Sequence, residues 1–123
     1  MIEGVVNADY EAIVTLPLRG PAGQEQEIEA VVDTGFNGYL TLPSASVAEL
    51  GLTLLGNVQA ELANGSWDDF DVYGVSVLWD GQPRYVPTDQ TDATPLVGMA
   101  LLDSHSLYVD VEDGGRVVIQ ARA

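Results

Sequence analysis

Two runs of alternating apolar and polar residues, joined by a glycine-rich turn, limit what this chain can fold into. Residues 11–18 and 26–32 alternate in this way, and Gly20-Pro21-Ala22-Gly23 lies between them. Short alternating runs on either side of a turn predict an antiparallel β-hairpin. The first third of the chain is therefore predicted to consist of two strands, and the second of them ends at Asp33.

A second hairpin is predicted in the middle of the chain. Val58–Leu62 alternates and runs into Asn64-Gly65, and a long second arm follows from Trp67 to Trp79. Asn-Gly is the preferred centre of a tight hairpin turn, because both central residues need positive φ. We expect a glycine-tipped hairpin here.

The rest of the chain predicts short elements. Pro43 and Ser44 are typical of a helix start, with Ser44 as N-cap, Ala45–Leu50 as a brief helix and Gly51 as its end. Thr88–Thr94 is polar and is predicted to be a loop. The remaining predicted strands are 39–42, 84–86, 107–111 and 116–119, the last two forming a hairpin about Gly114-Gly115. The architecture is predicted to be mainly β, with one or two short helices.

Length and hydropathy predict one soluble domain, 1–123. A chain of 123 residues can bury roughly two-thirds of its unfolded surface, and 46% hydrophobic residues is normal for a globular protein. No apolar run approaches the ~20 residues of a membrane span, and Met1-Ile2-Glu3 lacks the basic start of a signal peptide. We therefore expect a cytoplasmic protein that does not bind membranes.

The charge balance excludes several kinds of chemistry. Nineteen acidic residues stand against four basic ones, all Arg, giving a net charge of −15. Such a chain repels phosphate backbones, so we expect no nucleic-acid partner. Cys and Lys are absent, and a metal cluster or histidine-dependent triad would rest on His105 alone. We expect no metal and no cofactor, which leaves carboxylates as the plentiful catalytic groups.

Asp33 is the carboxylate that most needs an explanation. It follows the apolar residues Val31 and Val32 and precedes Thr34 and Gly35. Burial disfavours the charged form of a carboxylate, so an Asp at the end of a buried strand needs a partner or a task. The alternative is an ordinary turn, because Asp-Thr-Gly also suits a plain loop.

Three motifs in this order resemble the retropepsin-like aspartic proteases, single-domain relatives of pepsin that work as homodimers. They are Val31-Val32-Asp33-Thr34-Gly35, the hairpin at Asn64-Gly65 where the family has its flap, and Leu96-Val97-Gly98, followed by a short helix expected near Met99. The likeness spans the whole chain and is greatest to the small microbial branch of the clan. It implies a closed acid-protease (retropepsin-like) barrel and an aspartic peptidase acting on peptides or proteins.

The resemblance also implies roles for individual residues. Asp33 of each subunit would supply one half of a catalytic carboxylate pair, and Thr34 would hydrogen-bond across the two-fold axis. Gly35 would leave room for the substrate backbone, and Gly98 would pack closely beneath the active-site loop.

Substrate contacts are implied at four further positions. Asn64 and Gly65 would close over the substrate at the flap tip, and Leu40 and Leu96 would line side-chain pockets, favouring apolar residues beside the cleaved bond. The chain departs from viral relatives, which carry an acid two residues after the triplet and an Arg directly after the second glycine. Asn37 and Met99 stand at those positions, so both members of that ion pair are missing together.

Other conspicuous residues have simpler interpretations. Asp68-Asp69-Phe70-Asp71 fails the spacing of a calcium loop and is expected to be a solvated strand arm. His105 lies in a polar stretch and is expected to be exposed, whereas Trp67 and Trp79 are expected in the core or an interface.

Two alternatives to a peptidase remain open. One is a non-catalytic peptide-binding or dimerisation module on the same fold, and the other is a monomeric acidic β domain.

Overall fold

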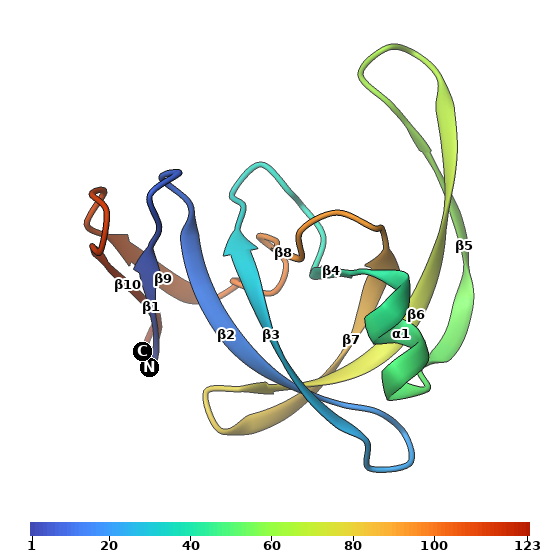
Figure 1. The fold of residues 1–123 in the computed structure, drawn as a ribbon, viewed down its shortest axis with the longest axis horizontal. Coiled ribbons are helices and arrows are strands. Elements are labelled where there is room, and N and C mark those ends of the chain that lie inside the picture. Colours follow the sequence, from blue (N-terminus) through green and yellow to red (C-terminus); the bar gives the residue numbers. More distant parts are fainter.

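The computed structural model describes all residues from 1 to 123 and contains ten strands and one helix (Figure 1). The elements, in chain order, are β1 (Ile2–Val6), β2 (Ala12–Arg19), β3 (Glu25–Val32), β4 (Leu40–Leu42), α1 (Ser44–Leu50), β5 (Thr53–Glu61), β6 (Trp67–Trp79), β7 (Gln82–Gln90), β8 (Leu96–Val97), β9 (His105–Val109) and β10 (Arg116–Ala121). The mainly β class predicted from the sequence is confirmed.

All ten strands belong to one strongly curled sheet. Its order is β5-β6-β7-β4-β8-β3-β2-β1-β10-β9, so β5 and β9 are the edge strands. The curl brings β6 back against β2, where Leu18 pairs with Val77 and Arg19 with Ser76. Closure of the barrel is limited to these two residue pairs. Two parallel pairings, β3 with β8 and β4 with β7, hold together the strands that carry the candidate site.

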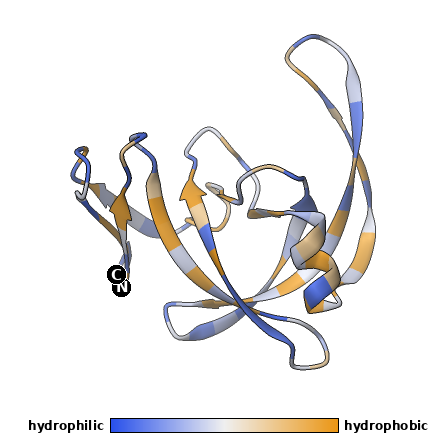
Figure 2. Cartoon of the chain, viewed as in Figure 1, coloured by the Kyte–Doolittle hydropathy of each residue, from blue (hydrophilic) through white to orange (hydrophobic).

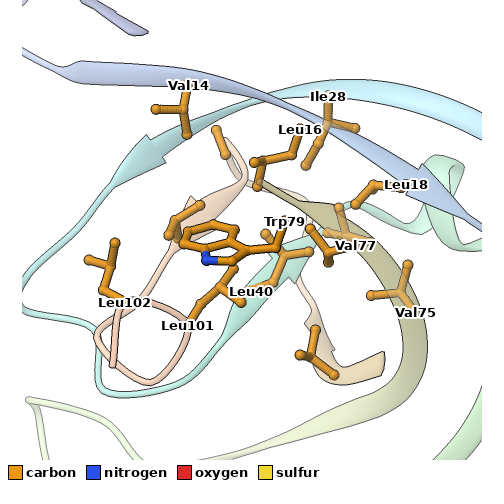
Figure 3. Packing of buried hydrophobic residues seen from close by; sticks show 14 of the residues in the cluster. Val14, Leu16, Leu18, Ile28, Leu40, Val75, Val77, Trp79, Leu101 and Leu102 are labelled. Atoms are coloured by element: carbon orange, nitrogen blue, oxygen red, sulfur yellow. The ribbon is translucent and has the colours of Figure 1, made fainter. Parts of the chain in front are cut away.

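The core lies inside the curl and consists of nineteen buried hydrophobic residues. Alternate residues of β2 and β6 point into it, as the alternating sequence requires. Figure 3 shows Trp79 lying among Leu16, Leu40, Val77 and Leu101. Trp79 is 3% exposed, which confirms its expected place in the core.

The β5–β6 hairpin projects beyond this core. Figure 1 shows it rising from the body and curving at its tip toward the loop after β3. All residues of 53–69 are exposed except Ala60, which is half-buried. Figure 2 shows polar and apolar segments following one another along both arms of the hairpin. Trp67 is 66% exposed, so it is not a core residue of this chain.

The helical predictions need correction. Pro43, not Ser44, is the N-cap of α1, and Ser44 is the first helical residue. Gly51 ends the helix in the left-handed conformation, as predicted. No helix follows Met99, where the chain makes consecutive turns up to Ser104. The single helix has seven residues, and none in the structure is long and apolar enough to cross a membrane.

Two polar residues lie elsewhere than predicted. Thr88 belongs to β7 rather than a loop and is fully buried, where its hydroxyl donates a hydrogen bond to the carbonyl of Leu40 at 3.0 Å. His105 is half-buried rather than exposed. Its Nε2 accepts a hydrogen bond from the indole N–H of Trp79 at 3.1 Å, so its contacts are with the core.

Candidate functional site

Asp33 stands at the exit of β3, at the point where two parallel strands end together. Val31 and Val32 pair with Leu96 and Val97 of β8, and the amide of Asp33 continues the ladder with a 2.9 Å hydrogen bond to the carbonyl of Val97. This pairing fixes the backbone at Asp33 against β8. Its side chain is half-buried.

The loop after β3 holds the carboxylate of Asp33 in one orientation. The amide of Gly35 donates to Oδ1 of Asp33 at 2.8 Å, and the amide of Phe36 donates to its carbonyl at 3.1 Å. This is the local turn that an Asp side chain forms with the backbone two residues on. Thr34 and Gly35 are both exposed at its crest. A Cβ at Gly35 would lie 3.2 Å from Oδ1 of Asp33, so the glycine keeps space beside the carboxylate.

Gly98 packs directly against the same loop. Its amide donates to the carbonyl of Tyr39 at 3.0 Å, and the next amide, of Met99, donates to the carbonyl of Phe36 at 2.8 Å. A Cβ at Gly98 would lie 2.1 Å from the carbonyl oxygen of Gly38. Only glycine fits this approach without moving backbone, so the Leu96-Val97-Gly98 motif supports the loop that carries Asp33.

The tip of the β5–β6 hairpin is built differently from the predicted turn. The amide of Gly65 donates to the carbonyl of Leu62 at 2.9 Å, and that of Leu62 to the carbonyl of Ser66 at 2.7 Å. Gly65 has φ of 83°, whereas Asn64 is not in the positive region. The connection is therefore a type I turn followed by a left-handed glycine, the common longer hairpin loop. Asn64 accepts from the amide and hydroxyl of Ser66 through Oδ1.

The two leucines expected to line pockets differ in accessibility. Leu96 is half-buried in β8, where its amide donates to Oγ1 of Thr41 at 2.9 Å. Leu40 is 1% exposed and belongs to the core. A side chain this deeply buried cannot reach a substrate in this conformation, so Leu40 supports β4 rather than lining the site.

The two positions that depart from the viral pattern are open to solvent. Asn37 is exposed in the loop after β3, and Met99 is 46% exposed directly after Gly98. Their backbone segments are joined, because the amide of Ala100 donates to the carbonyl of Gly38 at 3.1 Å. Backbone hydrogen bonds connect these segments without an ion pair.

Several residues that support the site were missed in the sequence. Thr41 and Thr88 bond backbone groups of β8 and β4, and Ser44 anchors the start of α1 by donating from its amide and hydroxyl to Oδ1 of Asp92, each at 2.8 Å. Those two hydrogen bonds, the backbone one first, lower the pKa of Asp92. Burial raises the pKa of Asp89, at the end of β7. Alternation through Val86 and Thr88 was the available signal for the longer strand.

The two main hollows of the surface lie away from Asp33. The larger, of about 510 Å³, is lined by residues of β2, β3, β6 and β7 such as Arg19, Gln26 and Leu78. The other, of about 410 Å³, lies beside Trp79, Arg84 and His105. Neither contains a residue of the Asp33 loop, and no group of three or more His, Asp or Glu side chains is placed to hold a metal.

The comparisons with known proteins agree with this geometry at the level of the fold. A solved structure described as a retropepsin-like aspartic protease from Rickettsia conorii is similar to this chain, with a TM-score of 0.58 and 19% sequence identity. The match covers 99% of this chain and 91% of that one. No family model matches the sequence, and no curated protein does.

Proposed function

We propose that this chain, which has the retropepsin-like fold, is an aspartic endopeptidase that hydrolyses peptide bonds as a homodimer. The observation that carries the proposal is the placement of Asp33. Its backbone is fixed by β8, its carboxylate is oriented by the amide of Gly35, and the loop around it is backed by Gly98. An ordinary turn acid also accepts such a hydrogen bond from the amide two residues on, but it needs neither the pairing with β8 nor the close approach of Gly98.

One chain supplies one such carboxylate, and the chemistry needs two. A two-fold axis beside Asp33 places the same residue of a second copy next to it. Two carboxylates a few ångströms apart cannot both ionise cheaply, so they hold one proton between them.

The pair divides the work of hydrolysis. The ionised carboxylate takes a proton from a bridging water, whose oxygen attacks the scissile carbonyl carbon. The protonated carboxylate donates a hydrogen bond to the carbonyl oxygen as charge develops there. The carboxylate that took the proton from water then gives it to the leaving nitrogen as the C–N bond breaks. No metal or cofactor takes part in these steps.

The neighbouring residues position this pair and the substrate. Thr34 is exposed at the crest of the loop, from which its hydroxyl can reach the partner loop across the axis. Gly35 leaves the substrate backbone room beside Asp33. Asn64 and Gly65 would cover the substrate when the β5–β6 hairpin closes, a motion that a weakly packed hairpin allows. Of the two leucines expected to line pockets, Leu96 is the one that remains accessible.

Dimerisation must overcome electrostatic repulsion. Two chains of −15 give −30, so the interface must bury enough apolar surface to offset that charge. The terminal strands provide such surface: β9 is an edge strand, and Val5 and Tyr108 are about half exposed (48% and 55%) on β1 and β9. Activity is expected to rise below neutral pH, where the shared proton is secure and repulsion falls. Flat or rising activity between about pH 5 and 9 would contradict this.

The second candidate is a peptide-binding or dimerisation module that uses the same fold without hydrolysis. The exposed, uncovered hairpin favours it, since a hairpin that grips a peptide needs no catalytic pair. The two candidates differ only in what Asp33 does.

Asp33→Asn separates the candidates. We expect cleavage of a mixed peptide library, followed by mass spectrometry, to be lost in the variant, while its melting temperature and sedimentation behaviour stay unchanged. Asp113→Asn, at an exposed loop position, is the matched control and should cleave like the unmodified chain. Equal cleavage by both variants would overturn the proposal.

A further inference from the structure

The two faces of the β5–β6 hairpin differ in charge, and the inner one is acidic. β6 pairs with β7 from Val72 to Trp79 without a register shift, and Val75, Val77 and Trp79 on its inner side are buried in the core. Because side chains alternate along a strand, the same side continues through Tyr73, which packs on the core, to Asp71, Asp69 and Trp67. The inner face of the hairpin is therefore the continuation of the core-facing side of β6.

The partner strand adds to this face. Asn57, Gln59 and Glu61 of β5 stand directly opposite Asp71, Asp69 and Trp67. The pairing is visible in the side chains as well, since Nδ2 of Asn57 donates to Oδ1 of Asp71 at 3.2 Å. Three carboxylates and an indole therefore share one face, defined here as the acidic face: Glu61, Trp67, Asp69 and Asp71.

The outer face of the same hairpin is mainly apolar. Val58 stands opposite Phe70, and Gly56 opposite Val72; Asp68, opposite Ala60, is the one acid on that side of β6 beyond the body. A hairpin that merely projected into water would gain nothing by turning three of its carboxylates toward the molecule. The carboxylates continue the core-facing side of β6, and Figure 1 shows the tip of the hairpin curving toward the loop after β3.

These carboxylates have no cationic side chain nearby in the sequence. Residues 20–83 contain no Lys, Arg or His, and the three ion pairs of the chain join the N-terminal amine to Asp80, Arg19 to Glu25 and Arg116 to Glu3. A surface lined by charges of one sign raises the local concentration of ions of the opposite sign. A cationic side chain would find several carboxylates here without displacing an existing partner.

Trp67 provides an independent reason to expect a cation. It is 66% exposed on the acidic face, directly across from Glu61. An indole is the side chain over which an ammonium or guanidinium group binds best, and a carboxylate beside it adds direct attraction. Exposing the apolar surface of a Trp to water is unfavourable. A need for solubility therefore does not explain a Trp between two carboxylate positions.

We propose that the acidic face selects peptide substrates carrying Lys or Arg within a few residues of the cleaved bond. This inference rests on the proposed function, since it takes the hairpin to close over the peptide held at Asp33. Closure would bring Asp69, Asp71 and Trp67 onto the substrate and exclude water, which strengthens the attraction between opposite charges. The accessible Leu96 supplies the apolar contact, and the acidic face selects the neighbouring cation.

The kinetic test uses one peptide sequence in three forms, with Lys, Gln or Glu beside the cleaved bond. We expect kcat/KM to fall from Lys to Gln to Glu, and the Lys-over-Gln preference to drop about fivefold to tenfold in Asp69→Asn/Asp71→Asn. Asn at position 71 can still accept from Asn57, so the hairpin is retained. Salt should reduce the preference in the unmodified chain.

Asp68→Asn is the matched control, because it removes one charge from the outer face of the same strand. The inference predicts that it changes the preference less than twofold. An equal loss in the single variants Asp68→Asn and Asp69→Asn would show that only overall charge matters and would overturn the assignment to one face.

A binding measurement keeps this inference separate from the proposed function. Fluorescence anisotropy of the three labelled peptides on Asp33→Asn reports selectivity without cleavage. Tighter binding of the Lys peptide, reduced in the Asp33→Asn/Asp69→Asn/Asp71→Asn chain, supports the acidic face even if no cleavage is ever seen. Equal binding of all three peptides overturns it, whether or not the unmodified chain is a peptidase.

Discussion

The same alternating sequence pattern has different results in the β5–β6 hairpin and in the rest of the molecule, which is called the body here. In the body, alternation along β2 and β6 places one set of side chains in a core of nineteen hydrophobic residues. In the hairpin, the same alternation separates an exposed acidic face from an apolar one, on which Val58 is exposed and Phe70 and Val72 are half-buried. Burial stabilises the first region, whereas residues 53–69 of the second are exposed apart from Ala60.

The largest contrast is expected for truncation of a core side chain. Leu16 is 1% exposed in β2 at the centre of the body. Leu16→Ala should lower the free energy of unfolding by about 2–5 kcal/mol, because the lost burial is compounded by a cavity. Denaturant unfolding monitored by tryptophan fluorescence would measure it. A decrease in the free energy of unfolding below about 1 kcal/mol would mean that burial in the core does not stabilise the body as expected.

Substitutions at two glycines, one in each region, compare how tightly the backbone is packed. A Cβ at Gly98 would lie 2.1 Å from a backbone oxygen of the Asp33 loop, whereas a Cβ at Gly56 in β5 meets nothing within 4 Å. Gly98→Ala should lower the free energy of unfolding by roughly 1–3 kcal/mol and reduce cleavage by displacing the loop. Gly56→Ala should leave stability nearly unchanged. Equal effects on melting temperature would contradict the close packing at Gly98.

The tether of α1 to the body gives a pH-dependent contribution. The hydrogen bonds from Ser44 lower the pKa of Asp92 in the folded state, so its ionised form stabilises the fold above the ordinary Asp value of 3.8. That stability is lost as the pH falls through the lowered pKa. Melting curves of the unmodified chain and Asp92→Ala should therefore differ at pH 7 and converge at about pH 2. A gap that stays constant across this range would contradict the assignment.

The smallest effect is expected in the hairpin itself. Val58 is 53% exposed on its outer face. Val58→Ala should change the free energy of unfolding by no more than about 0.5 kcal/mol, since no core contact is lost. Denaturant unfolding, run beside Leu16→Ala, would measure it. A loss comparable to that of Leu16→Ala would show that the hairpin packs on something in the free protein and would remove the contrast between the two regions.

The sequence predicted what depends on local pattern. Alternation identified the hairpins on either side of Gly20–Gly23 and Asn64-Gly65, and the apolar run before Asp33 identified the strand that carries it. Gly51 ends α1 as its position after Leu50 predicts. Each of these features depends on neighbouring residues, so a single sequence is enough to find it.

What depended on distant contacts was not predictable. Thr88 is polar yet buried, because Leu40, forty-eight positions earlier, accepts its hydrogen bond. His105 joins the core through Trp79, and the start of α1 is anchored by Asp92 rather than by Ser44 as its own cap. The inner and outer faces of the hairpin can be distinguished only from the way β6 continues out of the core.

The central claim, that Asp33 is half of a site completed by a second chain, is tested most directly by mixing subunits. The unmodified chain is combined with an equal amount of Asp33→Asn, allowed to exchange, and assayed for cleavage. If two Asp33 residues are needed, only about a quarter of the dimers are active, and cleavage falls to about a quarter of that shown by the same total amount of unmodified chain. A fall to only one half would show that each chain acts alone and would contradict the account.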